Sequence, residues 1–420
     1  MNVCVMGLGY IGLPLAAVLA RSGYKVLGVD IKPAVVRSIE SGEIHGLEPP
    51  LGLLVIEAIR RGSLSLCDPV PHADVYILAV PTPLKKKKHQ VDLSYVEKAV
   101  DSVAPRLRPG NLVIIESTVP VGTTEKMSRR LLELRPDLER EGKSLIFVAH
   151  CPERVLPGKI LDEMVEVDRI VGGVDAGSTR EAGDFYATFV RGSIHRTEAR
   201  TAEMCKLAEN ASRDVAISFA NELSMLCDKM GIDAANLIRL ANHHPRVNIM
   251  DPGPGVGGHC IPVDPWFLVQ SEPQGTDLIR TARKVNEKKT AWLLKRIEET
   301  ISHFEKPVIA CLGLAYKPEV ADLRGSPAVS IVNSLCSQNR GDLRIVEPHI
   351  KDLPPVLAGF NCCRLVDLEE AIAEASVVAL LTRHNSFEGI QARLPDGKIF
   401  IDPNGVVSPG WRRSGTEAAN

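Results

Sequence analysis

Short apolar runs of strand length alternate with helical patterns in the first and last thirds of the chain. The first series covers residues 3–6, 24–29, 75–80, 112–115 and 145–148, and the second covers 308–312, 343–346, 377–381 and 398–401. Strands that alternate with helices predict parallel sheets. Between the two series, helical spacing of apolar residues predicts helices at 197–230, 232–241 and 278–305. We therefore predict an α/β protein with two α/β domains, 1–196 and 301–420, joined by a central helical domain, 197–300, that contains a long linking helix.

Composition narrows the class of protein without naming a function. The chain has 420 residues, 45% of them hydrophobic and 24% charged, with a net charge of −2. This charge balance predicts no nucleic-acid partner, and the absence of an apolar run of about 18 residues predicts no membrane span. The ten cysteines form no CxxC pair, and Cys362 directly precedes Cys363. We therefore predict reduced thiols, a cytoplasmic location and no metal site.

The first strand leads into Gly7-Leu8-Gly9-Tyr10-Ile11-Gly12, and the second ends at Asp30. A GxGxxG pattern between a strand and a helix, with an acidic residue after the next strand, predicts a Rossmann-like dinucleotide-binding unit. The cofactor pyrophosphate would rest on the helix N-terminus. Asp30 would bind a ribose hydroxyl and repel a 2′-phosphate, which predicts NAD over NADP, although Lys32 nearby weakens this preference. The alternative is an α/β turn that binds no ligand.

Polar residues follow several of the predicted strands. Thr82, Ser117 and Thr118 fall at carboxyl ends of strands, where parallel sheets bind ligands, so we predict that they line the cofactor cleft. Their alternative role is to cap turns. Glu153 and Arg154 follow the 145–148 run and are placed to act on a ligand, or else form a surface ion pair. We interpret the four lysines at 85–88 as a solvated loop.

Two stretches in the central region carry candidate chemistry. Glu203, Lys206, Asn210 and Arg213 recur at spacings of three and four residues and so share a helix face, which indicates either a cleft or ordinary helix surface. Further on, Cys260 ends a glycine-rich stretch that begins at residue 255. We predict a helix entry with Asp264 as the N-cap and Pro265 at the first helical position. A cysteine beside a helix N-terminus is favoured as a thiolate nucleophile; the alternative is a cysteine that fills a gap.

Taken together, the motifs resemble the UDP-glucose/GDP-mannose dehydrogenase family from residue 1 to about residue 405. They occur in this order: Gly7–Gly12, Pro81-Thr82-Pro83, Glu116-Ser117-Thr118-Val119-Pro120, Pro152-Glu153-Arg154, Lys206-Leu207-Ala208-Glu209-Asn210, Gly257-Gly258-His259-Cys260 and Asp322-Leu323-Arg324-Gly325-Ser326. The stretch 152–158 resembles the branch that acts on N-acetylated sugars. The stretches 244–249, 253–260 and 264–267 most resemble the UDP-N-acetyl-D-mannosamine dehydrogenases. The four lysines at 85–88 depart from the expected loop.

The resemblance implies a four-electron oxidation of a sugar C6 alcohol to a carboxylate with two NAD⁺ in turn. Asp264 and Lys206 are the candidate bases for the first oxidation. Cys260 would form a thiohemiacetal and then a thioester, which water activated by Glu153 would hydrolyse. Lys206 and Asn210 would hydrogen-bond the oxyanion.

The resemblance also implies binding roles and an oligomer. The cofactor residues would be Gly7, Gly9, Tyr10, Ile11, Gly12, Asp30, Thr82, Thr118 and Arg324. The UDP-sugar residues would be Arg154, Val155, Lys206, Asn210, Arg213, His244, Arg246, Gly257, Tyr316 and Lys317. Arg246 would reach the site of a partner subunit, which implies a homodimer.

Several alternatives stay open at this point. UDP-N-acetylglucosamine, UDP-N-acetylgalactosamine and UDP-glucose are alternative substrates. A two-electron hydroxyacid dehydrogenase would need a lysine but no cysteine. A cofactor-binding regulatory protein without catalysis is disfavoured because Glu153, Lys206, Cys260 and Asp264 are all present.

Overall fold

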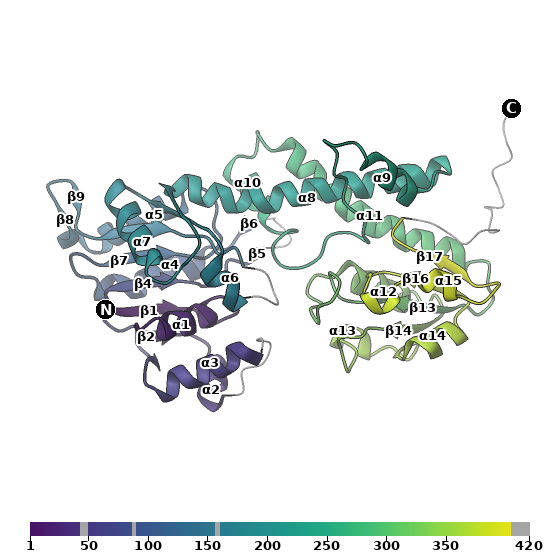
Figure 1. Ribbon diagram of the computed structural model, residues 1–420, viewed down its shortest axis with the longest axis horizontal. Helices are drawn as coiled ribbons and strands as arrows, with labels where there is room; N and C mark the ends of the chain where they lie inside the picture. Colours follow the sequence, from purple (N-terminus) through teal and green to yellow (C-terminus); the bar gives the residue numbers. More distant parts are fainter. Residues whose placement is uncertain (43–48, 86–89, 156–159, 405–420) are drawn as a thin grey trace. The chain divides into compact units, whose positions relative to one another are not determined.

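The protein is described by a computed structural model that covers residues 1–42, 49–85, 90–155 and 160–404 (Figure 1). It forms two compact units. The first comprises Met1–Glu209 and Trp266–Pro273, and the second comprises Asn210–Pro265 and Gln274–Asn420. Among the helices of the described residues, none is long and apolar enough to cross a membrane. Of the lysine run, only Lys85 is described, and Nζ of Lys85 lies 3.5 Å from Oδ2 of Asp92.

The first unit is built on an eight-stranded sheet of order β12-β11-β10-β7-β4-β1-β2-β3. All neighbouring strands are parallel except the antiparallel pair of β10 and β11. The strands are β1 (Asn2–Met6), β2 (Lys25–Val29), β3 (Leu64–Leu66), β4 (Val75–Leu78), β7 (Leu112–Ile115), β10 (Phe147–His150), β11 (Arg169–Gly173) and β12 (Ile194–Glu198). Two short hairpins stand apart from this sheet: β5 (Leu84–Lys85) with β6 (Gln90–Val91), and β8 (Glu139–Arg140) with β9 (Lys143–Ser144).

Helices cover both faces of this sheet. Strands β4 and β7 are buried along their whole length, which is why they are continuous apolar runs. One core lies under α1 (Gly12–Arg21), α2 (Pro33–Ser41), α3 (Pro49–Arg60), α6 (Ile160–Glu166) and α7 (Ala176–Ala187). The opposite core lies under α4 (Ser94–Val103) and α5 (Thr123–Leu134). The 3₁₀ turns η1 (Ala104–Arg106) and η2 (Pro136–Leu138) follow these two helices.

Strand β10 begins two residues later than the apolar pattern predicts. The amide of Leu145 donates to the carbonyl of Leu138 at 2.8 Å, so this residue belongs to the β8–β9 hairpin region and not to the sheet. The amide of Phe147 is the first to bond toward β7, through the carbonyl of Asn111 at 2.9 Å. The shift places His150 at the end of the strand and leaves Glu153 and Arg154 in the loop beyond it.

Two helices continue from one unit into the other. The linking helix α8 (Ala199–Met230) has 32 residues and confirms the predicted long helix; it ends at Gly231, whose φ of +68° suits glycine. Helix α10 (Asp264–Ser271) starts in the second unit and ends in the first. The catalytic candidates therefore belong to both units: Glu153 and Lys206 lie in the first, and Asn210, Cys260 and Asp264 in the second.

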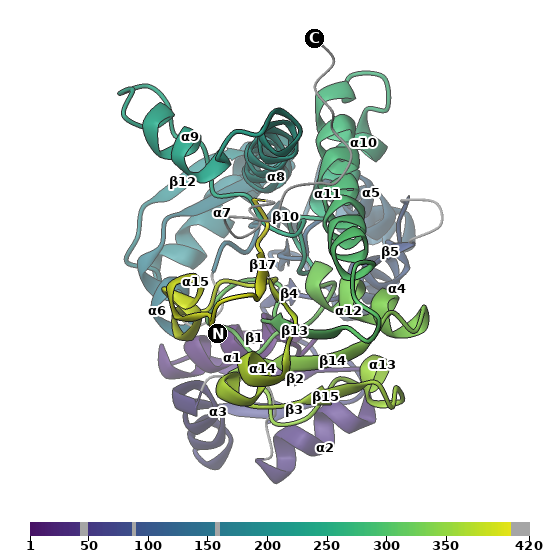
Figure 2. The same ribbon diagram turned by 90° about the vertical axis from the view of Figure 1, so that its right-hand side faces the viewer.

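Within the second unit, α8 lies beside α11 (Asp277–Ile301) in both views (Figures 1 and 2). Buried polar contacts join the two helices. Arg283 Nη1 donates to Asp214 Oδ1 at 2.6 Å, and Asn221 Nδ2 donates to Asn286 Oδ1 at 2.9 Å. Helix α9 (Ala234–Ala241) starts after Asp233, whose side chain accepts from the amide of Asn236.

The second unit also contains a parallel sheet, of order β15-β14-β13-β16-β17. Its strands are β13 (Val308–Leu312), β14 (Asp342–Val346), β15 (Cys363–Leu365), β16 (Val377–Leu380) and β17 (Ile399–Ile401). The remaining helices are α12 (Pro327–Ser337), α13 (Pro355–Ala358), α14 (Leu368–Glu374), the 3₁₀ turn η3 (Asn385–Phe387) and α15 (Ile390–Arg393). Two Rossmann-like sheets and a helical region confirm the predicted fold class.

The first turn of the second sheet repeats the geometry of the first turn of the chain. The amide of Gly7 donates to the carbonyl of Val29 at 2.8 Å, and the amide of Leu8 donates to Oδ2 of Asp30 at 2.9 Å. In the second unit, the amides of Gly313 and Leu314 donate to Val346 O at 2.8 Å and Glu347 Oε2 at 2.6 Å. Each unit therefore carries a glycine turn closed by an acidic residue at the end of its second strand.

Candidate functional site

The glycine turn after β1 has the backbone geometry of a dinucleotide site. Gly7 has a φ of +90°, and a Cβ there would lie 2.6 Å from the carbonyl oxygen of Ala79. A Cβ at Gly12 would lie 1.8 Å from the carbonyl oxygen of Gly7, so only glycine permits this close packing of helix on strand. A Cβ at Gly9 would meet nothing within 4 Å, which leaves the backbone open to a ligand.

The start of α1 suits an anionic group. Tyr10 and Ile11 precede the helix, the side chain of Ile11 caps no amide, and no acidic residue lies in the first turn. The positive end of the helix dipole therefore meets no side-chain carboxylate of its own first turn. These residues fit the pyrophosphate of a dinucleotide, as the sequence predicts.

Asp30 is held in a fixed position at the end of β2. Its Oδ2 accepts from the amide of Leu8 at 2.9 Å, and its Oδ1 accepts from the amide of Lys32 at 2.8 Å. Both bonds come from the backbone, so the carboxylate is oriented by the turn itself. The role of Asp30 in binding a ribose hydroxyl stays a prediction.

Thr82 and Ser117 tie neighbouring strand ends together. Thr82 Oγ1 donates to the carbonyl of Thr118 at 2.8 Å, and Ser117 Oγ donates to the carbonyl of Val80 at 2.7 Å. Both hydroxyls therefore bond to backbone carbonyls of the turns, which matches turn capping, the alternative role considered for these residues from the sequence. Thr118 is half-buried at the same edge of the sheet. A cofactor role for Thr82 and Thr118 stays a prediction.

Glu153 is half-buried in the loop after β10. Burial raises the pKa of Glu153, and the nearby charges of Lys206 and Arg169 act in the opposite direction. Its Oε1 accepts from the amide of Val155 in a short bond. A carboxyl with a raised pKa is a stronger general base than an ordinary exposed glutamate. Residues 156–158 of the stretch 152–158 lie outside the described residues.

Arg154 does not pair with its neighbour Glu153. Its Nη2 lies 2.8 Å from Oε1 of Glu209 on α8, and its Nη1 donates to the carbonyl of Asp168 at 3.0 Å. Glu209 therefore orients the guanidinium that the sequence assigned to the substrate. Glu209 belongs to the Lys206–Asn210 motif, and its contact with Arg154 could not be predicted from the spacing of residues along the chain.

Glu203 has a structural role that sequence reasoning missed. It is 1% exposed, and its carboxylate accepts from the amides of Gly122 and Thr124 at 2.5 and 2.7 Å. These amides belong to the start of α5, so Glu203 caps that helix and complements its dipole. Lys206 and Asn210 are half-buried and Arg213 is exposed, so the four residues on this side of α8 differ in environment.

A buried polar group lies behind the Glu153 loop. Glu116 is 3% exposed and accepts from the hydroxyl of Tyr186 at 2.8 Å. Burial raises the pKa of Glu116 to about 7 despite the opposing charge of Arg169. Arg169 is 1% exposed, and its Nε and Nη1 find no hydrogen-bond partner among the described residues. Sequence reasoning missed this group, because a single arginine in a strand gives no signal.

Cys260, Asp264 and Asn210 are connected in the second unit. Asn210 Nδ2 donates to Asp264 Oδ2 at 2.5 Å. The carbonyl of Cys260 accepts from the amides of Val263 and Asp264, at 2.9 and 2.8 Å. Asp264 is 4% exposed, whereas Cys260 is half-exposed. The side chain of Asn210 therefore orients the buried carboxylate beside a cysteine that solvent can reach.

Asp264 is the first residue of α10 and not its N-cap. The amide of Asp264 already makes a helical bond to the carbonyl four residues earlier, so the turn of 260–263 precedes the helix directly. This difference of one position keeps Cys260 ahead of the helix N-terminus, as predicted.

The glycines before Cys260 make room for Tyr316. A Cβ at Gly257 would lie 2.7 Å from Cβ of Tyr316, and one at Gly258, whose φ is +90°, would lie 3.0 Å from its ring. The amide of Gly258 donates to the carbonyl of Arg324 at 3.0 Å. The predicted substrate residues Gly257 and Tyr316 are therefore neighbours in space.

The loop after β13 holds its charged residues in place. Nζ of Lys317 lies 6.0 Å from the ring centre of Tyr316. Arg324 Nη2 donates to Asp322 Oδ2 at 2.6 Å, and the pKa of Asp322 is lowered because hydrogen bonds from Arg324 outweigh the effect of burial. Arg324 therefore makes an intramolecular pair, and its predicted contact with the cofactor stays a prediction.

His244 and Arg246 lie on an exposed loop after α9. Asn242 closes this loop: its Nδ2 donates to the carbonyl of Ile249 at 2.9 Å, and its Oδ1 accepts from the amide of Ile249 at 2.7 Å. The amide of Arg246 donates to Nδ1 of His244 at 3.3 Å. The loop thus presents both side chains at the surface of the second unit.

Comparison with known proteins identifies the family of this chain. Its segments 1–190, 200–288 and 310–409 match the NAD binding, central and UDP binding domains of the UDP-glucose/GDP-mannose dehydrogenase family. It is 50% identical over 395 residues to the UDP-N-acetyl-D-mannosamine dehydrogenase of Campylobacter jejuni, covering 93% of this chain and 97% of that one. It is 49% identical over 411 residues to the NDP-N-acetyl-D-galactosaminuronic acid dehydrogenase of Ralstonia nicotianae, covering 97% and 96%. The solved UDP-D-ManNAc dehydrogenase of Pyrococcus horikoshii superposes with a TM-score of 0.83 at 40% identity, covering 96% and 95%. The chain belongs to the UDP-glucose/GDP-mannose dehydrogenase family.

Proposed function

We propose that this protein oxidises the C6 hydroxyl of a UDP-N-acetylhexosamine, first of all UDP-N-acetyl-D-mannosamine, to the uronic acid with NAD⁺. The observation that carries the proposal is the connected set of Asn210, Asp264 and half-exposed Cys260 in a chain that matches all three family domains. The relative from Campylobacter jejuni, which is named for this sugar, supports the choice of substrate.

The first oxidation converts the alcohol to an aldehyde with loss of one proton. Lys206 or Asp264 takes this proton, directly or through water. The 7–12 turn and Asp30 would hold NAD⁺, which would supply the hydride acceptor for each oxidation. The charge of Lys206 and the amide of Asn210, one helical turn apart on α8, stabilise the negative oxygen that develops at C6.

Cys260 makes the second oxidation feasible. Its thiolate adds to the aldehyde to give a thiohemiacetal, whose tetrahedral carbon is a better hydride donor than the aldehyde itself. Loss of the second hydride and a proton leaves a thioester. Glu153 takes a proton from water, which attacks the thioester, and the products are the carboxylic acid and the free thiol.

A second substrate is supported by a specific finding. The relative from Ralstonia nicotianae, 49% identical, is named for N-acetyl-D-galactosaminuronic acid, so UDP-N-acetylgalactosamine is the second candidate. The choice of substrate is tested by initial rates with UDP-N-acetylmannosamine, UDP-N-acetylgalactosamine, UDP-N-acetylglucosamine and UDP-glucose. We expect the highest kcat/KM for UDP-N-acetyl-D-mannosamine. A higher value for UDP-glucose would overturn the assignment to N-acetylated sugars.

NAD is expected to be preferred over NADP because Asp30 is fixed by the amides of Leu8 and Lys32. A 2′-phosphate beside this carboxylate would cost on the order of 1–4 kcal/mol. The measurement is kcat/KM with each cofactor at subsaturating concentration. Asp30→Asn should narrow the difference in kcat/KM between NAD and NADP. Asp68→Asn, which lies outside the turn, serves as the control and should leave this difference unchanged. Equal values for both cofactors in the unmodified enzyme would contradict this role.

We further propose a homodimer in which Arg246 reaches the partner's site. We also propose that the protein acts in the reducing environment of a cytoplasm. Three large apolar side chains on α8 are exposed in the second unit: Phe219 at 55%, Leu226 at 50% and Met230 at 64%. Exposed apolar side chains of this size, repeated along one helix, favour a protein partner. All ten cysteines are free thiols, which fits a reducing compartment.

Mixed dimers test the shared site. Arg246→Ala and Cys260→Ser should each be inactive alone, but their mixture should recover activity, because one site of the hybrid keeps an intact Cys260 and receives Arg246 from its neighbour. At full exchange of equal amounts, about one quarter of the unmodified activity is expected, since half of the dimers are hybrids with one intact site. Subunit exchange is verified by native mass spectrometry. Exchange without recovery would contradict the shared site.

A further inference from the structure

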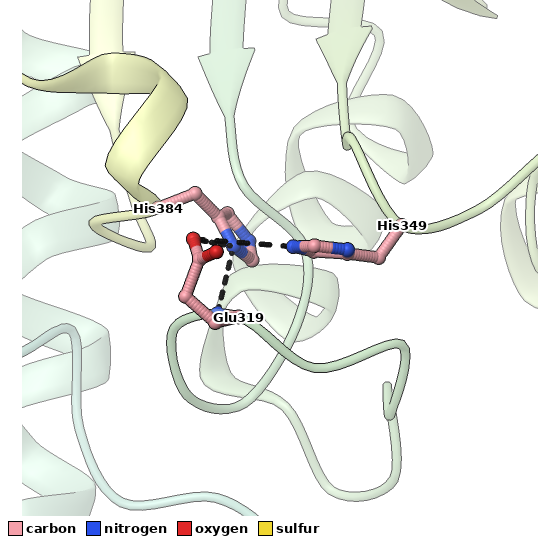
Figure 3. Close-up of side chains that lie close together, drawn as sticks. All are labelled: Glu319, His349 and His384. Carbon is pink, nitrogen blue, oxygen red and sulfur yellow. Dashed lines mark hydrogen bonds and ion pairs between the residues drawn. The ribbon is translucent and has the colours of Figure 1, made fainter. Parts of the chain in front are cut away.

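Three side chains with metal-binding atoms converge at the carboxyl edge of the second sheet: Glu319, His349 and His384 (Figure 3). They follow β13, β14 and β16, and their ligand atoms all lie within 4.8 Å of one another. Oε1 of Glu319 lies 3.5 Å from Nδ1 of His384 and 3.9 Å from Nε2 of His349. Two imidazoles and one carboxylate form a ligand set typical of Zn²⁺ and similar divalent ions.

A buried carboxylate orients the central histidine. The side chain of His384 is 0% exposed, and its Nε2 lies 3.1 Å from Oε2 of Glu347, whose side chain is also 0% exposed. The same oxygen of Glu347 accepts from the amides of Leu314 and Ala315, at 2.6 and 2.9 Å. An ionised carboxylate can only accept, so Nε2 of His384 carries the proton. A carboxylate behind a histidine is the usual support of a protein metal ligand.

The other nitrogen of His384 therefore offers a lone pair toward Glu319. Nδ1 accepts from the amide of Glu319 at 3.0 Å. Glu319 has a φ of +59°, unusual for a residue with a side chain, and this conformation directs both its amide and its carboxylate toward His384. A metal ion at Nδ1 would displace the N–H donor of Glu319. The carboxylate of Glu319, whose Oε1 also accepts from the amide of Asn385 at 2.8 Å, would become a second ligand.

The cluster is accessible to solvent. Glu319 and His349 are exposed, so an ion can enter without unfolding the loop. A surface cavity of about 490 Å³, lined by Glu347, Pro348 and Phe387 among others, flanks the cluster. Three protein ligands leave a tetrahedral ion one further position, which water can occupy.

We propose that Glu319, His349 and His384 bind one divalent transition-metal ion of the Zn²⁺ class. The bound ion ties together the loops that follow β13, β14 and β16, and Glu319 lies two residues after Lys317 in the first of these loops. The ion stabilises the folded second unit, because it binds the folded chain and not the unfolded one. Hard cations such as Mg²⁺ prefer oxygen ligands and should bind poorly. The competing interpretation is an ion-pair cluster that binds no metal.

Thermal unfolding with Zn²⁺ or Mg²⁺ distinguishes the two interpretations. Zn²⁺ should raise the Tm of the metal-free protein and Mg²⁺ should not. The variants His349→Ala and Glu319→Gln change exposed residues, so they should fold. Their Zn²⁺ affinity, measured by isothermal titration calorimetry, should fall by about tenfold or more. Glu388→Gln, another exposed glutamate in the same unit, serves as the control and should bind as the unmodified protein does.

Cobalt distinguishes this cluster from the ten cysteines, which also attract Zn²⁺. Co²⁺ held by nitrogen and oxygen ligands gives visible absorption bands without the intense near-ultraviolet charge-transfer band of a thiolate complex. The spectrum of the protein with Co²⁺ should contain the visible bands without the charge-transfer band, and the His349→Ala variant should lose the visible bands. Unchanged Zn²⁺ affinity in both His349→Ala and Glu319→Gln would overturn the proposal, as would a Tm that Zn²⁺ does not change.

Discussion

Cys260→Ala is expected to bind UDP-sugar and NAD⁺ yet make almost no acid. The thiol is needed only for the second oxidation, so acid formation should fall by on the order of 10⁶-fold, as for a serine protease that loses its nucleophile. The first hydride transfer does not formally need the thiol, so aldehyde or its hydrate should appear slowly. The measurement is product analysis by mass spectrometry beside NADH absorbance.

The matched control for this variant is Cys362→Ala. Cys362 is half-buried, like Cys260, but it follows no glycine stretch and precedes no helix. Its replacement should leave turnover nearly unchanged. Alkylation should inactivate the unmodified enzyme, and bound UDP-sugar should slow this inactivation. Full four-electron turnover by Cys260→Ala would refute the covalent mechanism and favour a hydroxyacid-dehydrogenase type of chemistry.

Arg283→Met is expected to destabilise the second unit by about 3–5 kcal/mol, the usual effect of breaking a buried ion pair. The side chains of Arg283 and Asp214 are 5% and 1% exposed, and their charged atoms are 2.6 Å apart. Methionine retains much of the arginine volume but leaves the Asp214 carboxylate buried without its counter-charge. Urea unfolding followed by circular dichroism measures the loss.

Two further variants isolate the ion pair in this experiment. Lys284→Met changes the next residue of α11, which is exposed, and should alter stability by about 0.5 kcal/mol or less. Asp214→Asn combined with Arg283→Met removes both charges and should recover part of the lost stability. A single Arg283→Met variant as stable as the unmodified protein would show that the pair does not hold α8 against α11.

The sequence predicted the sheets well because their strands are buried on both faces. Residues 112–115 and 308–312 coincide with β7 and β13, since an apolar run flanked by polar residues leaves little freedom in the boundaries. The predictions named no strand for β11 or β12. Arg169 is the first residue of β11, and every residue of β12 is exposed or half-buried, so neither strand has the sequence pattern of a central strand. The family resemblance, which the motifs predicted from residue 1 to about residue 405, was confirmed by matches to all three family domains.

The candidate site residues were named from the sequence and their roles stay predictions, whereas the contacts between them could not be predicted. The motif that contains Lys206 and Asn210 gave no sign that Glu209 holds Arg154, because the two residues are distant in sequence. The glycine-rich stretch before Cys260 gave no sign that Tyr316 packs against Gly257 and Gly258. The cluster of Glu319, His349 and His384 was missed, and no metal was predicted, because only the fold brings the ends of three strands together.

The number of NADH molecules formed per UDP-sugar tests the four-electron oxidation most directly. A limiting amount of UDP-N-acetyl-D-mannosamine is converted completely with excess NAD⁺, and NADH is measured by absorbance while the sugar product is identified by mass spectrometry. The account predicts two NADH and one uronic acid for each sugar consumed. One NADH per sugar, with the aldehyde as the final product, would contradict it.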